Sequence, residues 1–177
     1  MNLTQAMQDF ILHWGEMGTH WGVNRSVAQV HALLHLSPKP LPAEGIAETL
    51  GLARSNVSTA LKELQGWKLV RVSRKLGDRR DHFTSVEDMF DLVRLVVEGR
   101  REREYAPTVA AVREAMALAE TDGETPPEVV TRLRQTLEVM ELFDGWYGEM
   151  AKLPRGTQMA LLLMGARLAR LLPKGSG

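Results

Sequence analysis

A short helical pattern enclosed by two glycines limits the fold of this chain more than any other feature. Gly51 precedes the stretch LARSNVSTALKEL (residues 52–64), and Gly66 follows it. Its apolar residues recur at the spacing of one helix face: Leu52, Val57, Ala60, Leu61 and Leu64. A preceding helix is predicted to reach residue 50, with Pro42 in its first turn. Two short helices joined by a tight glycine turn are a helix-turn-helix.

The residues after this helix pair have the pattern of a β-hairpin. Val70 and Val72 alternate with polar residues, which predicts a strand over 69–74. Residues 75–80, with the sequence KLGDRR, are predicted to form the turn, and a return strand is predicted over 81–85. A helix-turn-helix followed by a hairpin is a winged helix.

The rest of the chain is predicted to be helical. Ahead of the helix pair, helices are expected over 3–16 and 26–36, and Gly15, Gly18 and Gly22 are interpreted as the end of the first. Further helices are expected over 86–105, then to about residues 119 and 147, and over 157–172. The predicted fold is mainly α with a small β-hairpin wing. The expected parts are a winged helix-turn-helix domain (1–85), a helical dimerisation and possible effector region (86–172) and a flexible tail (173–177).

The side of the 52–64 helix opposite its apolar face is short, polar and basic. It carries Arg54, Ser55, Asn56, Ser58, Thr59 and Lys62. Arginine and asparagine can pair bidentately with guanine and adenine in the major groove, and hydroxyls can bond bases or phosphates. Such a face also occurs on any exposed helix, so by itself it leaves DNA binding and an ordinary solvated surface equally open.

The predicted hairpin turn is rich in cations. Arg74, Lys75, Arg79 and Arg80 crowd around it, and a basic tip of this kind can enter the narrow minor groove beside a major-groove helix. Asp78 is expected to pair with Arg79 or Arg80 and steady the tip, and Gly77 permits a positive φ. A basic hairpin placed directly after a helix-turn-helix favours DNA binding more strongly than either element alone.

The charge is unevenly distributed although the total is zero. Residues 53–82 carry a net charge of +5, and residues 86–150 carry −8. This distribution is typical of a polyanion-binding segment attached to an acidic body. The chain has no cysteine, which excludes disulfides, thiolate zinc sites and cysteine nucleophiles. Without a membrane-length apolar run or a signal-peptide pattern, the protein is expected to be cytoplasmic.

Residues 41–83, LPAEGIAETLGLARSNVSTALKELQGWKLVRVSRKLGDRRDHF, resemble the winged helix of the GbsR/MarR family of bacterial transcription regulators. The upstream stretch WGVNRSVAQVHALLHLSPKPL and the helical C-terminal part resemble that family too. Two positions depart from the family pattern, because Ala53 stands where a serine helix cap is usual and Gly45 stands where a glutamate is typical.

The resemblance implies a homodimer that binds a palindromic site on double-stranded DNA and represses nearby genes. Matching positions imply base or backbone contacts from the outward face of the 52–64 helix and wing contacts from Arg79 and Arg80. The dimer is expected to form through the helices from residue 86 onward together with 3–16. An effector bound between these helices and the winged helix is expected to change the spacing of the two recognition helices and release DNA.

Relatives in this family sense small molecules, some of them choline-like cations, which aromatic cages recognise. Only ten aromatic residues are present, and two groups stand out as effector candidates. The first comprises Trp14 and Trp21, and the second Phe143, Trp146 and Tyr147. Ordinary core packing is the more common role for such residues.

His31 and His35 are spaced i, i+4 on one predicted helix, a geometry that can bind a transition metal. No further ligand lies near them in sequence. A core position or a pH-sensitive dimer interface therefore stays open beside the weak metal alternative, and no metal or cofactor is predicted.

The sequence favours regulation over other functions. The chain has none of the common catalytic motifs, such as a nucleophile elbow, a P-loop or an H-E-x-x-H pair, so an enzyme is not expected. A ligand-independent architectural DNA-binding protein and a protein-interacting winged helix remain the alternatives. The basic recognition face disfavours a protein partner, and the large acidic helical half disfavours a purely architectural role.

Overall fold

The computed structural model describes residues 1–168 and divides the chain into two units, Met1–Arg101 and Glu102–Gly177. The tail predicted over 173–177 and the end of the last predicted helix lie outside the described residues. The division predicted at residue 85 stays a prediction. No helix within residues 1–168 is long and apolar enough to cross a bilayer.

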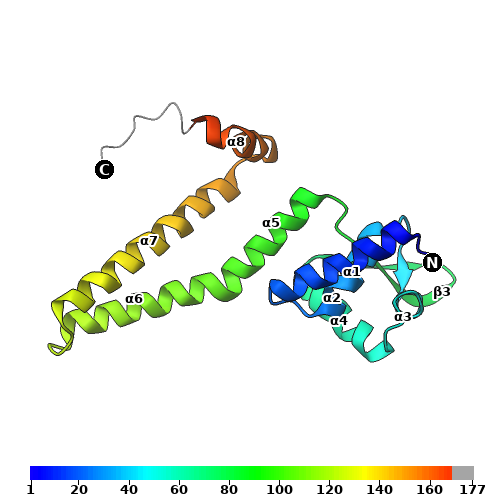
Figure 1. The fold of residues 1–177 in the computed structure, drawn as a ribbon, viewed down its shortest axis with the longest axis horizontal. Helices are drawn as coiled ribbons and strands as arrows, with labels where there is room; N and C mark the ends of the chain where they lie inside the picture. The colour runs from blue at the N-terminus through cyan, green and yellow to red at the C-terminus, as the bar shows by residue number, and fades with distance from the viewer. Residues whose placement is uncertain (169–177) are drawn as a thin grey trace. The chain divides into compact units, whose positions relative to one another are not determined.

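The first unit has the predicted mainly α fold with a hairpin wing (Figure 1). Two helices come first, and a short strand leads into the helix pair of the helix-turn-helix. A β-hairpin and one further helix follow. In chain order these elements are α1 Gln5–His20, α2 Arg25–Leu36, β1 Leu41–Pro42, α3 Ala43–Leu50, α4 Arg54–Gly66, β2 Val70–Lys75, β3 Asp78–Ser85 and α5 Met89–Arg100.

The three strands form one antiparallel sheet in the order β1-β3-β2. Leu41 pairs with Phe83, and Val72 pairs with the same residue from the other side. The short β1 therefore ties the start of α3 to the wing, and helix pair and hairpin form one winged helix.

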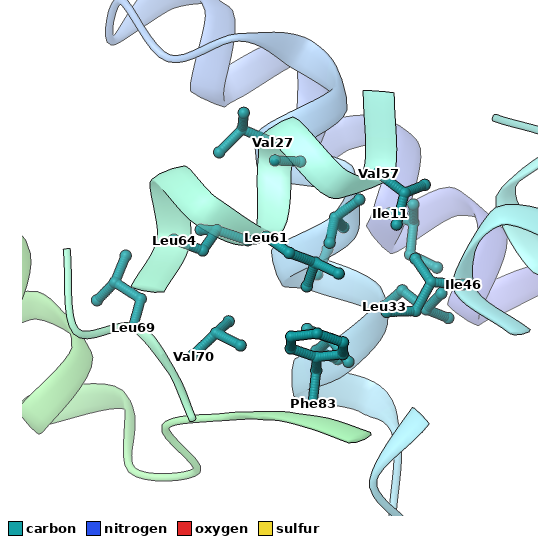
Figure 2. Packing of buried hydrophobic residues seen from close by; sticks show 14 of the residues in the cluster. Ile11, Val27, Leu33, Ile46, Val57, Leu61, Leu64, Leu69, Val70 and Phe83 are labelled. Atoms are coloured by element: carbon teal, nitrogen blue, oxygen red, sulfur yellow. The ribbon is translucent and has the colours of Figure 1, made fainter. Parts of the chain in front are cut away.

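The core of this unit lies between α2, α4 and the sheet (Figure 2). Val57, Leu61 and Leu64 of α4 point inward with Ala60, and Leu33 of α2 and Phe83 of β3 belong to the same cluster. Burying each large aliphatic side chain contributes about 1.5–3 kcal/mol relative to exposure. Because this face of α4 is fixed in the core, the opposite face must point to solvent.

The predicted end of the first helix is wrong, because α1 continues through Gly15 and Gly18 and ends at His20. Both glycines are buried against α2. A Cβ at Gly15 would lie 2.8 Å from Cγ of Gln29, and one at Gly18 would lie 2.5 Å from Cβ of Ala28. These residues are glycine because the two helix backbones approach closely, and Gly22, with φ +75°, provides the turn.

Gly18→Ala is expected to lower the free energy of unfolding by about 1–2 kcal/mol, since α1 and α2 must separate to accommodate one methyl group. Urea unfolding measures the change. Gly148→Ala is the matched control, because a Cβ there meets nothing within 4 Å and alanine is the better helix former. Equal stability of Gly18→Ala and the parent protein would contradict this close packing.

The second unit contains a helical hairpin. A π-helical turn, Arg101–Tyr105, precedes α6 Ala106–Thr121, and α7 Pro127–Lys152 and α8 Arg155–Leu168 follow. The hydroxyl of Tyr105 donates to the carbonyl of Met140 at 3.0 Å, and an ion pair between Arg113 and Glu141 closes to 2.6 Å. These contacts hold the π-helical turn and α6 against the middle of α7.

Candidate nucleic-acid interface

The six polar side chains predicted to contact DNA lie on the solvent side of α4. All are exposed, and within residues 1–168 none of them makes a side-chain hydrogen bond or ion pair: Arg54, Ser55, Asn56, Ser58, Thr59 and Lys62. Helical threonines elsewhere bond back to a carbonyl, as Thr49 does at 2.6 Å and Thr131 at 2.9 Å. The hydroxyl of Thr59 keeps its full bonding capacity for a partner.

Helical spacing orders these residues around α4. Ser55, Thr59 and Lys62 lie opposite the buried face, while Asn56 and Ser58 lie at its two edges. Arg54 is in the first turn. The protruding face thus presents hydroxyls and one ammonium at its centre, flanked by an amide that can read a base edge.

The first turn of α4 has no side-chain cap. Ala53 occupies the N-cap with φ −61° and ψ 141°, and its methyl group cannot accept a hydrogen bond. The first backbone N–H groups of any helix lack an intrahelical partner, and here no cap side chain accepts from them. A helix start of this kind favours a phosphate oxygen.

Ala53→Ser is expected to raise the free energy of unfolding by about 1 kcal/mol, because the backbone already has the N-cap conformation and the hydroxyl can accept from an N–H of the first turn. Thermal and urea unfolding measure the gain. Ala53→Thr should reproduce most of it, whereas Ala53→Val should not. A serine variant no more stable than the valine variant would show that residue 53 is not the cap.

The hairpin turn is tighter than predicted. Only Leu76 and Gly77 connect the strands, and Gly77 has φ +83°. The prediction that residues 75–80 form the turn is wrong, because Arg79 and Arg80 belong to β3. Lys75 pairs with Asp78 and Arg74 with Asp81, which leaves the two arginines without counterparts on β2, as a β-bulge.

Asp78 holds this bulge in place. Its carboxylate accepts from the backbone N–H of Arg80 at 3.0 Å and from the guanidinium of Arg80 at 2.6–3.2 Å. These hydrogen bonds from Arg80 keep the pKa of the Asp78 carboxyl well below its usual range. Asp78 is predicted to pair with Arg79 or Arg80, and its partner in the structure is Arg80.

The four wing cations are not equivalent. Arg80 pairs with Asp78, and Nε of Arg74 lies 3.2 Å from Oδ1 of Asp81. Arg79 and Lys75 are exposed and make no ion pair with the residues that the structure describes. Because no acid neutralises them, Arg79 and Lys75 are the wing cations best able to contact DNA phosphates.

The aromatic effector candidates lie in different surroundings. Trp14 stacks between Phe10, at a centroid distance of 5.3 Å, and His31, at 6.1 Å. Trp21 is exposed, and its carbonyl accepts from Arg100. In the second unit, Phe143 and Trp146 are exposed on α7, and Tyr147 is half-buried. Trp14 therefore has a packing role, and the effector assignment of all five stays a prediction.

The two histidines of α2 lie at the edge of the core. The His31 ring is buried, stacks on His35 at 6.2 Å and is hydrogen-bonded through Nε2 to Oγ of Ser85 at 3.2 Å. Burial, and secondarily the neighbouring His35, lower the pKa of His31 to about 4. The described residues contain no group of three potential metal ligands, so this pair has no third protein ligand there.

Comparison with known proteins shows which family part of the chain is similar to. Residues 21–81 match the sequence model of the MarR family. The HTH-type transcriptional repressor GbsR of Bacillus subtilis (strain 168) is 26% identical over 97 residues, which cover 55% of this chain and 53% of GbsR. The match thus spans about half the length of that relative. A crystal structure of a transcriptional regulator superposes with a TM-score of 0.56 at 21% identity, over 81% of this chain and 94% of the other. At this identity the superposition establishes the fold.

Proposed function

We propose that the protein is a transcriptional regulator that binds specific double-stranded DNA as a homodimer, because its residues 21–81 match the sequence model of the MarR family and include a winged helix-turn-helix. The proposal is supported by two adjoining surfaces of one unit whose polar or charged groups have no partner there. The solvent face of α4 has unengaged hydrogen-bonding groups, and the adjoining wing has two cations, Lys75 and Arg79, without an acidic partner.

In this proposal α4 lies in the major groove. Asn56 and Arg54 read base edges, while hydroxyls and the open helix start hold phosphates. The wing places Arg79 and Lys75 against the neighbouring minor groove, with Arg80 held back by Asp78. Contacts to phosphates supply affinity that falls with salt, and contacts to bases supply sequence choice.

An exposed apolar stripe on α7 supports dimerisation. Leu142, Phe143 and Trp146 are 70%, 60% and 59% exposed and occupy one side of the helix, and apolar groups of this kind are usually covered by a partner. Helical spacing places Arg132 and Glu149 on the same side. An antiparallel pairing of two α7 helices about a two-fold axis near residues 140 and 141 brings Arg132 of each copy opposite Glu149 of the other. This pairing therefore matches opposite charges across the two-fold axis.

Two copies on one palindromic site place their recognition helices about 34 Å apart, one turn of DNA. We further propose that binding represses transcription, as the name of the Bacillus subtilis relative suggests, and that a small molecule modulates it. Repression follows where the site overlaps a promoter, because the bound dimer excludes the polymerase.

Fluorescence anisotropy with labelled DNA from upstream of the protein's own gene, compared with scrambled DNA at several salt concentrations, tests the proposal. Preference for the native sequence, a steep salt dependence and two chains per site are expected. Equal and weak affinity for both DNAs would favour the architectural alternative. No binding at low salt would favour a winged helix that binds protein.

A further inference from the structure

An open pocket of about 440 Å³ lies within the first unit, away from the outward face of α4. Its walls come from the end of α4, the base of the wing and α5. The lining residues are Gln65, Lys68, Val70, Arg71, Val86, Asp91, Arg94 and Leu95. Pockets of this volume are in the range that encloses small organic ligands.

The pocket combines an apolar floor with a basic rim. Val70 and Val86 are buried, and Leu95 packs against the core. Lys68 and Arg71 are exposed and make no side-chain hydrogen bond or ion pair with the described residues. Charge on this rim is therefore positive over a hydrocarbon surface, which is complementary to an anion with an apolar body.

The third cation of the rim, Arg94, is only partly neutralised. Its Nε lies 3.7 Å from Oδ1 of Asp91, too far for a close hydrogen bond. One carboxylate thus faces three cations across this pocket. The charged groups of the lining therefore sum to +2, which favours an anionic head group.

Lys68 occupies a backbone position that favours glycine. It has φ +59°, and within residues 1–168 no other non-glycine residue has a positive φ. Its N–H donates to the carbonyl of Gln65, and the N–H of Leu69 donates to that of Leu64, both at 2.9 Å, which is the Schellman pattern at a helix end. A lysine at this position is strained where glycine would not be, and such strain concentrates at functional sites.

The DNA backbone is a less suitable occupant than a small anion. Lys68 follows the last turn of a helix of 13 residues, about 20 Å from its first turn. The first turn is the part of α4 that approaches the bases. An apolar floor also adds nothing to phosphate binding.

We propose that this pocket binds a small amphipathic anion, a carboxylate or phosphate on a short hydrocarbon body, held by Lys68, Arg71 and Arg94. The occupant touches the end of α4, β2 and α5 at once, so binding fixes the wing relative to the recognition helix. The link from binding to altered DNA affinity rests on the proposed function, whereas binding itself does not.

Isothermal titration calorimetry of the full chain without DNA tests the site, with octanoate and octyl phosphate as probes and octanol as the uncharged control. Lys68→Gly is the informative variant, because it removes the cation and also relieves the positive φ. This variant should fold, and its melting temperature should equal or exceed that of the parent protein. Lys68→Gly and Arg71→Gln should each weaken binding of the anions about fivefold. Lys39→Gln, which removes an exposed cation outside the pocket, should not weaken it.

The Lys68→Gly/Arg71→Gln double variant should lose the preference for the anions over octanol. A stronger loss for octyl phosphate than for octanoate identifies phosphate as the preferred head group, and the reverse identifies carboxylate. Absence of saturable binding by both anions, or equal affinities of the parent and double variant, would overturn the site. Repeating the DNA titration with octanoate then tests coupling separately, because a probe that binds without changing DNA affinity leaves the site intact and contradicts only its regulatory role.

Discussion

Acidification from about pH 7.5 to about pH 5 is expected to lower the free energy of unfolding by about 2 kcal/mol through His31 alone, and by about 3 kcal/mol near pH 4. The ring is buried against Trp14, His35 and Ser85, and no acidic group pairs with it among the described residues. Protonation in the folded state therefore places an uncompensated charge in the core.

The direction follows from the two pKa values. The pKa of His31 is about 4 in the folded protein and near 6.5 in the unfolded chain. Well above pH 6.5 the ring is neutral in both states and has no effect on the pH dependence. Between the two values only the unfolded chain takes up the proton, so stability falls as the pH falls, and the loss is complete below about pH 4.

Urea unfolding of the parent protein and His31→Phe at both pH values measures this contribution. Phenylalanine keeps a ring beside Trp14 but cannot be protonated, so the variant should lose less stability on acidification. His13→Gln, which removes an exposed histidine from α1, should behave like the parent. An NMR titration gives a second measurement that needs no variant, and an imidazole pKa of His31 near 6.5 would contradict the prediction.

Periodicity predicted the parts of the fold that depend on local sequence. The inward set of α4 and the alternation around Val70 and Val72 each place apolar groups on one side of an element, which is sufficient to identify helix and strand. Gly15 and Gly18 lie inside α1, although glycine in a helical pattern is typical of a helix end. Glycine is needed at these two positions because α2 lies close to α1, and this proximity is visible only in the folded structure.

The candidate site also has one part that the sequence predicts and another that it does not. The positions of the buried residues of α4 determine which of its side chains face outward. The sequence was therefore sufficient to predict the outward face. The β-bulge at Arg79 and Arg80 was not predictable from alternation, because it depends on which N–H the Asp78 carboxylate accepts from. The sequence shows only the positive charge of Lys68. Its left-handed backbone conformation depends on how α4 ends in three dimensions.

Asn56→Ala is expected to weaken binding to the specific DNA site by about 1–3 kcal/mol, which is about 5- to 150-fold in Kd, with little change on scrambled DNA. The amide lies exposed at the edge of the α4 face and makes no side-chain hydrogen bond within residues 1–168. Its removal should not destabilise the fold, since alanine is the better helix former. A loss of affinity can then be attributed to a base contact.

Arg79→Ala provides the contrast. Arg79 has no acidic partner in the described residues. Its loss should therefore weaken binding to the specific and the scrambled DNA by similar factors and reduce the salt slope by about 1. Gln65→Ala, which removes another exposed side-chain amide from the same helix, should leave both affinities unchanged. If Asn56→Ala instead weakened binding to both DNAs equally, the amide would be contacting the DNA backbone, and the salt slope would stay unchanged because a neutral amide releases no counterions. Sequence choice would then have to come from Arg54 or from the hydroxyls at the centre of the face.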